Sequence, residues 1–484
     1  MASDAFAAEF SKEPESAVSP GYFTDGLYAA APAILDSASA ETLAFAARYR
    51  TRFGEDPGWE AIAGYDSSRL AITAMRAAVR EAAGGDVRRR REAVRRYLMS
   101  LDSQAHAVSS LTGPLWFTPQ RGRQQVARIG RFHTTLFESA PLQLVQASAP
   151  TQAEIATGAV LPVGDDLYVK RQRVVYTGVF VNEIPRVDIA SASFTADFYV
   201  WLRFAQEAGL DAADATDLDF PDLVRGNFDA RRLSAQGNLD DGTVYRLWRV
   251  RGDFKNDFDL HHYPYDRQTL KVRLFNARSA SDRIVYVKDR RSMLTQAGAG
   301  STVAPETFRN LTQWDSLWSE QLRDALVTAS ALGDPRLVGV ERSRELSGYR
   351  VEIEIQRKLL ATLAKTLLPL FIMTLIMLAA LHFPHNLVKE KITVAVTGAL
   401  SGAVLLSSVN SQLGAVGYTM AVEYVFYVFF GLCLMSILSV LVAERLRVGH
   451  RNAAASRTEF VTRALFLLTV AAVGAAAVLA ASRW

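Results

Sequence analysis

An apolar segment near the C-terminus carries polar side chains at a spacing that could line an ion pathway. Within residues 389–411, seven positions recur at alternating steps of three and four, so on a helix they share one face. In chain order they are Glu390, Thr393, Thr397, Leu400, Val404, Ser407 and Ser411. A stripe facing lipid would be uniformly apolar, whereas an acid, hydroxyls and two apolar residues in this order are typical of a water-filled pore with a hydrophobic constriction. The stripe therefore predicts a pore-lining helix.

Small residues in the same segment leave a second interpretation open. Ala395, Gly398, Gly402 and Ala403 would allow neighbouring helices to approach closely. On that interpretation the segment is a packing helix and lines no pore.

This segment is one of four apolar stretches long enough to cross a bilayer, which takes about 20 residues. The stretches are 359–381, 392–413, 418–442 and 461–481. Basic residues lie in the links before the second and the fourth stretch, but not in the short link between the second and the third. The positive-inside rule places the two basic links in the cytoplasm and both chain ends outside. Pro369 is expected to kink the first helix.

Composition excludes several classes of protein. The 484 residues are 49% hydrophobic and 21% charged, with a net charge of +4. No basic strip alternates with aromatic residues, so no nucleic-acid partner is expected. The sequence has no nucleotide-binding glycine loop, nucleophile elbow or zinc-site histidine spacing, so we expect neither an enzyme nor a cofactor.

Periodicity divides the rest of the chain in two. Residues 165–357 contain short alternating strands, an all-β pattern, at 174–181, 194–204, 245–250, 268–275 and 349–355. Residues 1–148 instead alternate helices with short apolar strands, which indicates an α/β lobe. We therefore predict a multidomain membrane protein with boundaries at 1–148, 149–357 and 358–484.

One segment of the β region resembles a known family. Tyr263-Pro264-Tyr265-Asp266-Arg267-Gln268 is similar to the signature loop of pentameric ligand-gated ion channels, the Cys-loop receptor superfamily. Asn256 and Leu270 stand where the two cysteines flank that loop, so the chain resembles the prokaryotic, disulfide-less branch. Pro369 and the run Glu390-Lys391-Ile392-Thr393 also resemble positions of the family's first and second membrane helices.

The resemblance implies an immunoglobulin-like β-sandwich over 149–357 and a four-helix transmembrane bundle over 358–484. It implies a homopentamer in the bacterial inner membrane that conducts monovalent cations, with five copies of Glu390 favouring them. A four-helix unit with a single polar-striped helix cannot enclose a pore alone, which also calls for cyclic assembly. The alternative is a membrane-tethered solute-sensing receptor without ion conduction, but such a receptor needs only one anchoring helix.

The resemblance also implies residues that couple the β region to the pore. They are Asp188, Pro264, Tyr265, Asp266 and Arg357, with Asp266 pairing with Arg357. Without the resemblance, Asp266 would be interpreted as an exposed turn aspartate.

The ligand site departs from the family. The positions implied for the pocket are Phe204, Asn227, Phe275 and Tyr349. Gly226 and Ala277 stand where the family usually has aromatic residues, and a cation–π cage needs several rings around one cation. An acetylcholine-like agonist is therefore not expected, and the agonist stays open between a small molecule and an ion.

An acidic run offers a possible metal site. Its members are Asp211, Asp214, Asp217, Asp219 and Asp222. Such a run could gather Ca²⁺, although it lacks the EF-hand spacing, and a solvated acidic loop is the other interpretation.

The N-terminal region resembles a second family. Tyr65-Asp66 and the segment 113–122 are similar to the later part of periplasmic branched-chain amino-acid binding proteins. Those proteins have two lobes, whereas residues 1–148 supply about one. The region is then either a degenerate modulatory lobe or the remainder of a truncated sensor.

Overall fold

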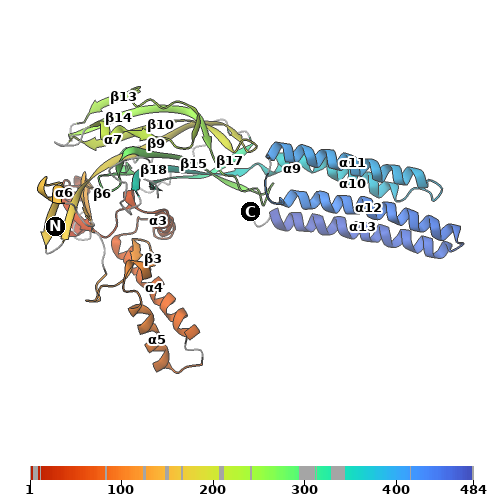
Figure 1. Cartoon of the computed structure of the whole chain (residues 1–484), viewed down its shortest axis with the longest axis horizontal. Coiled ribbons are helices and arrows are strands. Elements are labelled where there is room, and N and C mark those ends of the chain that lie inside the picture. Colours follow the sequence, from red (N-terminus) through yellow and green to blue (C-terminus); the bar gives the residue numbers. More distant parts are fainter. Residues whose placement is uncertain are drawn as a thin grey trace.

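The computed structural model of the chain describes residues 2–3, 9–10, 12–81, 84–123, 127–147, 152–164, 167–206, 212–239, 242–293, 311, 313–328, 344–414 and 416–481. The molecule is elongated, with a helical region at one end and a β region beside it (Figure 1). The N-terminal region lies against the part of the β region that is farthest from these helices (Figure 1).

The N-terminal region mixes helices with a small sheet. The sheet has the order β1-β2-β5-β6, with β1 parallel to β2 and the other pairs antiparallel. Its strands are β1 (Ala2–Ser3), β2 (Tyr28–Ala31), β5 (Arg128–His133) and β6 (Leu136–Ser139). A hairpin and further short elements accompany it: α2 (Pro14–Val18), η1 (Leu35–Ser37), η2 (Gln104–His106), β3 (Val108–Ser110) and β4 (Gly113–Leu115).

Three longer helices complete this region: α3 (Ala40–Phe53), α4 (Trp59–Glu81) and α5 (Val87–Met99). Side chains cap two of them, because Ser39 accepts a hydrogen bond from the amide of Thr42 and Asp86 accepts one from the amide of Arg89. Gly54, at φ 82°, ends α3 in the left-handed conformation that glycine adopts readily. The mixed α/β character predicted for this region is confirmed.

Two sheets build the β region. The larger has the order β12-β14-β10-β9-β16, with β13 on β14 and both β7 and β8 on β9. Its strands are β7 (Leu142–Gln146), β8 (Val160–Gly164), β9 (Leu167–Asp188), β10 (Ser193–Ala205), β12 (Leu223–Gly226), β13 (Ala235–Asn238), β14 (Thr243–Lys255) and β16 (Ile284–Lys288). The smaller has the order β11-β15-β18-β17, from β11 (Leu218–Asp219), β15 (Arg267–Ala280), β17 (Trp314–Thr328) and β18 (Arg344–Arg357). Short helices α6 (Gln152–Ala156), α7 (Ala212–Thr216) and α8 (Arg290–Met293) lie between strands.

The two sheets share one hydrophobic core. Phe198 and Trp248 of the larger sheet belong to the same buried cluster as Tyr349 and Ile353 of the smaller one. Because successive side chains of a strand point to opposite faces, the alternation seen in the sequence buries one face of each sheet.

The larger sheet recruits a strand from before residue 149. Strand β7 pairs antiparallel with β9, from Leu142 opposite Arg173 to Gln146 opposite Val169. The predicted boundary between residues 148 and 149 therefore separates β7 from the sheet that it completes. Nothing in the local pattern of 142–146 reveals this, because strand pairing is a long-range contact.

The C-terminal region is helical, with α9 (Leu359–Thr366), α10 (Leu368–Ala380), α11 (Val388–Leu413), α12 (Ala421–Val448) and α13 (Asn452–Ala481). Helices α11, α12 and α13 are each long and apolar enough to cross a membrane, and α10 is a shorter apolar helix. The first predicted span is divided between α9 and α10. Pro369 lies at this division. It has no amide hydrogen to donate to the carbonyl of Lys365, and the missing hydrogen bond interrupts the helix.

Helix α11 packs against α10 and α12, and α12 packs against α13. Gly402 allows the contact with α12, since a Cβ atom at this position would lie 2.8 Å from the ring of Phe429. Ala395 and Gly402 are buried, whereas Ala403 is exposed. Small residues therefore do serve helix packing, but on a different face of α11 from the polar stripe.

Candidate ion pathway and its contact with the β region

The polar stripe of α11 lies on an exposed face of the single chain. All seven stripe positions, from Glu390 to Ser411, are exposed, and Leu400 and Val404 expose 67% and 65% of their surface. The buried residues of the same helix are Lys391, Ala395, Gly402, Val409 and Leu413. The stripe is thus presented away from α10 and α12.

Two hydroxyls of the stripe have their hydrogen directed to the helix backbone. Thr393 Oγ1 donates to the carbonyl of Lys389 at 2.8 Å, and Ser411 Oγ donates to the carbonyl of Ser408 at 2.8 Å. A hydroxyl that donates in this way keeps its lone pairs for an outside partner. These positions can therefore accept hydrogen bonds from water or coordinate a cation.

At the end of the helices away from the β region, one acid holds three cations. Glu459 of α13 lies 2.8 Å from Arg447, 3.8 Å from Lys391 and 4.0 Å from Arg463. Arg463 also donates to the carbonyl of Leu381 at 3.1 Å. This cluster joins α11, α12 and α13 to the end of α10. It turns Lys391 inward, while the neighbouring Glu390 stays on the exposed face.

At the opposite end, Asp266 and Arg357 form a buried ion pair. Arg357 Nε and Nη2 donate to the two carboxylate oxygens of Asp266 at 2.9 and 3.1 Å. The guanidinium also lies over the rings of Trp314, at 4.2 Å, and Tyr263, at 4.8 Å. Gln268 donates to Asp266 Oδ2 at 2.8 Å. Asp266 is only 2% exposed, so it is not the solvent-exposed turn residue that its sequence position alone would suggest.

A hydrogen bond closes this loop beside Asn256 and Leu270, the two positions that flank it. Asn256 is buried, and its Oδ1 accepts a hydrogen bond from the amide of Lys271 at 3.2 Å. Leu270, the second position, is fully buried in the core between the sheets. The side chain of Asn256 thus bridges the two ends of the loop without a covalent bond.

The loop is bound directly to the helices. The amide of Leu260 donates to the hydroxyl of Tyr418 at 2.9 Å, and the amide of Ala421 donates to the carbonyl of His261 at 3.0 Å. The rings of His261 and Tyr418 stack at 3.7 Å. Tyr265 donates to the carbonyl of Ala477, near the end of α13, at 3.2 Å. Pro264 is buried beside these contacts and follows a cis peptide bond.

A second contact joins the turn 189–192, between β9 and β10, to the end of the striped helix. A Cβ atom on Gly414 would lie 3.1 Å from the backbone of Ala190. Asp188 shapes this turn by accepting a hydrogen bond from the amide of Ser191 at 3.1 Å. Asp188 is the last residue of β9 and borders this turn. Sequence reasoning missed the contact made by Gly414, and its only signal was a glycine directly after the striped helix α11.

The four positions implied for a ligand pocket do not share an exposed surface. Phe204 and Tyr349 lie in the core between the sheets, and Phe275 is 2% exposed. Asn227 is exposed on the surface. Because the three aromatic side chains are covered by the chain's own packing, they offer no surface to a ligand in this arrangement.

The acidic run is also dispersed. Asp217 lies 2.5 Å from Arg278, Asp219 is in strand β11, and Asp211 lies outside the described residues. Burial raises the pKa of Asp222 above its ordinary value. Over the described ranges, no group of three or more His, Cys, Asp or Glu side chains could hold a metal ion.

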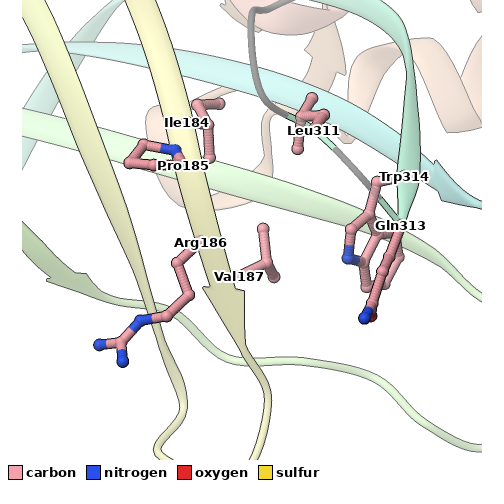
Figure 2. A pocket seen from close by; sticks show the side chains of 7 residues that line it. All are labelled: Ile184, Pro185, Arg186, Val187, Leu311, Gln313 and Trp314. Atoms are coloured by element: carbon pink, nitrogen blue, oxygen red, sulfur yellow. The ribbon is translucent and has the colours of Figure 1, made fainter.

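A small pocket lies beside the ion pair of Asp266 and Arg357. It has a volume of about 120 Å³ and is lined by residues 184–187 of β9 together with Leu311, Gln313 and Trp314. Figure 2 shows Leu311 and Trp314 across from β9, with the guanidinium of Arg186 extending away from Trp314. Trp314 is also the ring that covers Arg357, so it contributes both to the pocket and to the ion pair.

No protein-family model matches the sequence, and no curated protein matches it.

Proposed function

We propose that the chain is one subunit of a homopentameric, cation-selective channel. The observation that carries this proposal is the exposure of all seven stripe residues on α11, while other faces of the helix pack within the chain. A closed ring of identical subunits would turn this stripe toward a common axis and remove it from lipid. The ring would place an acid, hydroxyls and two apolar levels along one pathway.

The finer architecture belongs to the same proposal. The β region is an immunoglobulin-like sandwich, supported by the core that its two sheets share. The helices are a four-helix transmembrane unit in which α9 and α10 together make one crossing. Both basic links lie at the end of the helices away from the β region, and the last helix ends near the β region (Figure 1). By the positive-inside rule this arrangement favours an orientation with the N-terminal regions and the C-terminus on the outer side. The resemblance to prokaryotic channels implies the inner membrane of a bacterium, so that this side is the periplasm.

Opening would start in the β region and act on the outer ends of the helices. Strand β18 ends at Arg357, one residue before the cap of α9. Asp266 binds this arginine and so connects it to the loop that contacts α12 and α13. The turn 189–192 touches the residue that ends α11. A shift of β9 and β10 relative to β18 would therefore move α11 relative to its neighbours. Leu400 and Val404 form the gate, because narrow apolar rings expel water.

Reconstitution of the full chain tests this function. We expect purified protein in planar bilayers to conduct, with a reversal potential in a NaCl gradient that favours Na⁺, and light scattering to give the mass of a pentamer. Glu390→Gln should shift the reversal potential toward zero and lower the conductance. Glu444→Gln, which removes an acid of α12 outside the stripe, is the matched control and should change neither.

A folded protein that stays monomeric and passes no current over a range of pH and Ca²⁺ would refute the channel. The alternative, a solute-sensing membrane receptor without conduction, would then be favoured. The agonist is a small molecule or an ion, and recordings with and without Ca²⁺ test the ion directly.

A further inference from the structure

Helices α4 and α5 form a hairpin that projects from the rest of the N-terminal region (Figure 1). Within the described residues from 70 to 99, the buried side chains are those of three small residues, Ala74, Ala78 and Ala93. Alanine side chains bury little apolar area, so this part of the hairpin gains little stability from its own packing. Most of its surface is open to a partner.

One open face of α4 is apolar. Ile72, Met75 and Val79 recur at steps of three and four, so they share a face of the helix. They expose between 46% and 57% of their surface. Contiguous apolar surface of this kind marks a contact site for a protein or a membrane. The hairpin belongs to the region farthest from the membrane helices, so the bilayer that those helices cross does not cover it (Figure 1).

Helix α5 adds a strong positive charge beside this apolar face. Its sequence begins Val-Arg-Arg-Arg-Arg, and its first turn has no acid. These four arginines, Arg88 to Arg91, are exposed, and none of them forms an ion pair with a described residue. Positive side chains at a helix N-terminus oppose the helix dipole and lower stability. An acidic partner would offset both this cost and the repulsion among the arginines.

A surface of opposite charge lies at the start of the N-terminal region. Glu9, Glu13, Glu15 and Glu55 are all exposed and together form what we call the acidic surface. Lys12 connects its two parts, because Lys12 Nζ binds Glu9 at 2.9 Å and both Glu9 and Glu55 raise the pKa of this lysine. The acidic surface therefore carries four carboxylates and one lysine.

The acidic surface also borders exposed apolar side chains. Val18 and Tyr22 follow it in the chain and expose 89% and 64% of their surface. The hairpin and the segment 9–22 thus each combine apolar area with charge, and the charges have opposite sign. Such complementarity favours one orientation of a contact over others.

The two surfaces lie too far apart to meet within one chain. Glu55 precedes α4 and Arg88 follows it, so the 23 residues of this helix separate them. At about 1.5 Å per residue the helix is about 35 Å long. An ion pair requires about 4 Å. The carboxylates that reach the arginines must therefore belong to another molecule.

We propose that the hairpin of α4 and α5 docks on the acidic surface of a second copy of this chain. The arginines at the start of α5 would pair with Glu9, Glu13 and Glu15 of the partner subunit. The apolar face of α4 would then lie against the segment that carries Val18 and Tyr22.

A contact between two different surfaces is head-to-tail, and such contacts generate rings when the rotation closes. The closed ring of N-terminal regions rests on the proposed pentamer, whereas the contact between two copies does not. In a pentamer, five identical contacts would join the N-terminal regions above the β regions.

Zero-length cross-linking of the full chain in detergent tests the contact. Carbodiimide joins a lysine amine to a carboxylate but does not react with arginine, so Arg91→Lys introduces a reporter. We expect a cross-linked dimer on a denaturing gel, with a peptide that joins position 91 of one chain to residues 9–15 of another. Arg232→Lys, at an exposed arginine of the β region, is the matched control and should give no such peptide. Adding Glu13→Gln and Glu15→Gln to Arg91→Lys should remove most of the cross-linked dimer.

Hydrogen exchange gives a second measurement that needs no cross-link. Changing Arg88, Arg91 and Arg95 together to glutamate should speed exchange of the α5 amides in the full chain. Acids near the start of a helix favour the isolated helix, so faster exchange would report a lost partner and not a weaker helix. Adding Glu13→Lys and Glu15→Lys reverses the acidic surface as well and should restore the exchange rate of the parent.

Three results would overturn the proposal: no cross-link from Arg91→Lys to residues 9–15, exchange of α5 that the triple reversal leaves unchanged, or no restoration by the second reversal. Protection of α5 by heparin in a chain that gives no cross-link would assign the arginines to a polyanion instead. A pentamer by light scattering without this cross-link would refute the contact alone. The cross-link in a protein that passes no current would refute the channel alone.

Discussion

Replacing Glu138 by glutamine tests whether one buried carboxylate makes the contact between the N-terminal and β regions depend on pH. Glu138, on β6, is 6% exposed. Its Oε2 lies 3.7 Å from Arg203 Nη2, too far for a hydrogen bond, and has no hydrogen-bond partner among the described residues. Arg203 instead donates to Asp289 at 3.0 Å.

The surroundings of Glu138 explain its titration. Burial raises its pKa from 4.5 to about 7. The acids Asp36 of η1 and Asp289 after β16 add to this increase in pKa, whereas the guanidinium groups of Arg203, on β10, and Arg291, on α8, oppose it. The phenol of Tyr176, on β9, lies beneath Arg203 and stays protonated, since burial raises its pKa further above the ordinary value.

The direction of the pKa shift of Glu138 determines how its contribution to stability depends on pH. Glu138 binds its proton more tightly when the two regions are in contact than in the unfolded chain. The contribution of Glu138 to the stability of the contact is therefore largest below pH 4.5 and is lost as the pH rises through about 7. At about 1.4 kcal/mol per pKa unit, the loss between pH 4.5 and pH 8 is about 3 kcal/mol.

Hydrogen exchange of backbone amides in β6 and β10 measures the free energy of opening at this contact. In the parent chain we expect that free energy to fall from pH 5 to pH 8, after correction for the intrinsic exchange rate. Glu138→Gln should remove most of the fall and protect both strands more strongly at pH 8. Glu92→Gln, an exposed glutamate of α5, is the matched control and should behave as the parent. Identical pH dependence in Glu138→Gln and the parent would refute the reasoning.

Four further predictions concern the proposed channel. Asp266→Asn leaves Arg357 buried without its anion and should lower stability by about 3–5 kcal/mol, measured by thermal unfolding of the detergent-solubilised chain; an unchanged midpoint would contradict this. Leu400→Thr should hydrate the constriction and raise spontaneous opening in single-channel recordings, and a variant as closed as the parent would place the gate elsewhere. Gly414→Ala, at φ 80° and against Ala190, should alter the opening threshold, whereas Gly417→Ala has open space around its Cβ atom and should not. A chain starting at Pro141 keeps β7 and should still form a conducting pentamer. A chain starting at Ala159 lacks β7, the partner of β9, and should be less stable. A folded monomer from the chain that starts at Pro141 would show that the N-terminal region is needed for assembly.

The regular elements follow from the sequence because their periodicity is local. The second apolar stretch, 392–413, predicts a helix, and α11 spans Val388–Leu413. Alternation over 194–204 likewise predicts β10, observed at Ser193–Ala205. The polar stripe can likewise be predicted from the sequence, because residues three and four positions apart share a helix face in any context. Division of the first apolar span between two helices also has a local cause in Pro369.

Burial and partners were decided by the tertiary structure alone. Phe204 and Tyr349 are aromatic residues on strands, and only the meeting of the two sheets decides that they face a core and not a ligand. Strand β7 joins the larger sheet through pairing with β9, which its own five residues do not encode. Glu138 and Arg203 come from different regions, and it is their burial side by side that raises the pKa of the glutamate. In each case a residue's surroundings come from chain segments distant in sequence, so the sequence determined which side chains were available and long-range packing determined what they face.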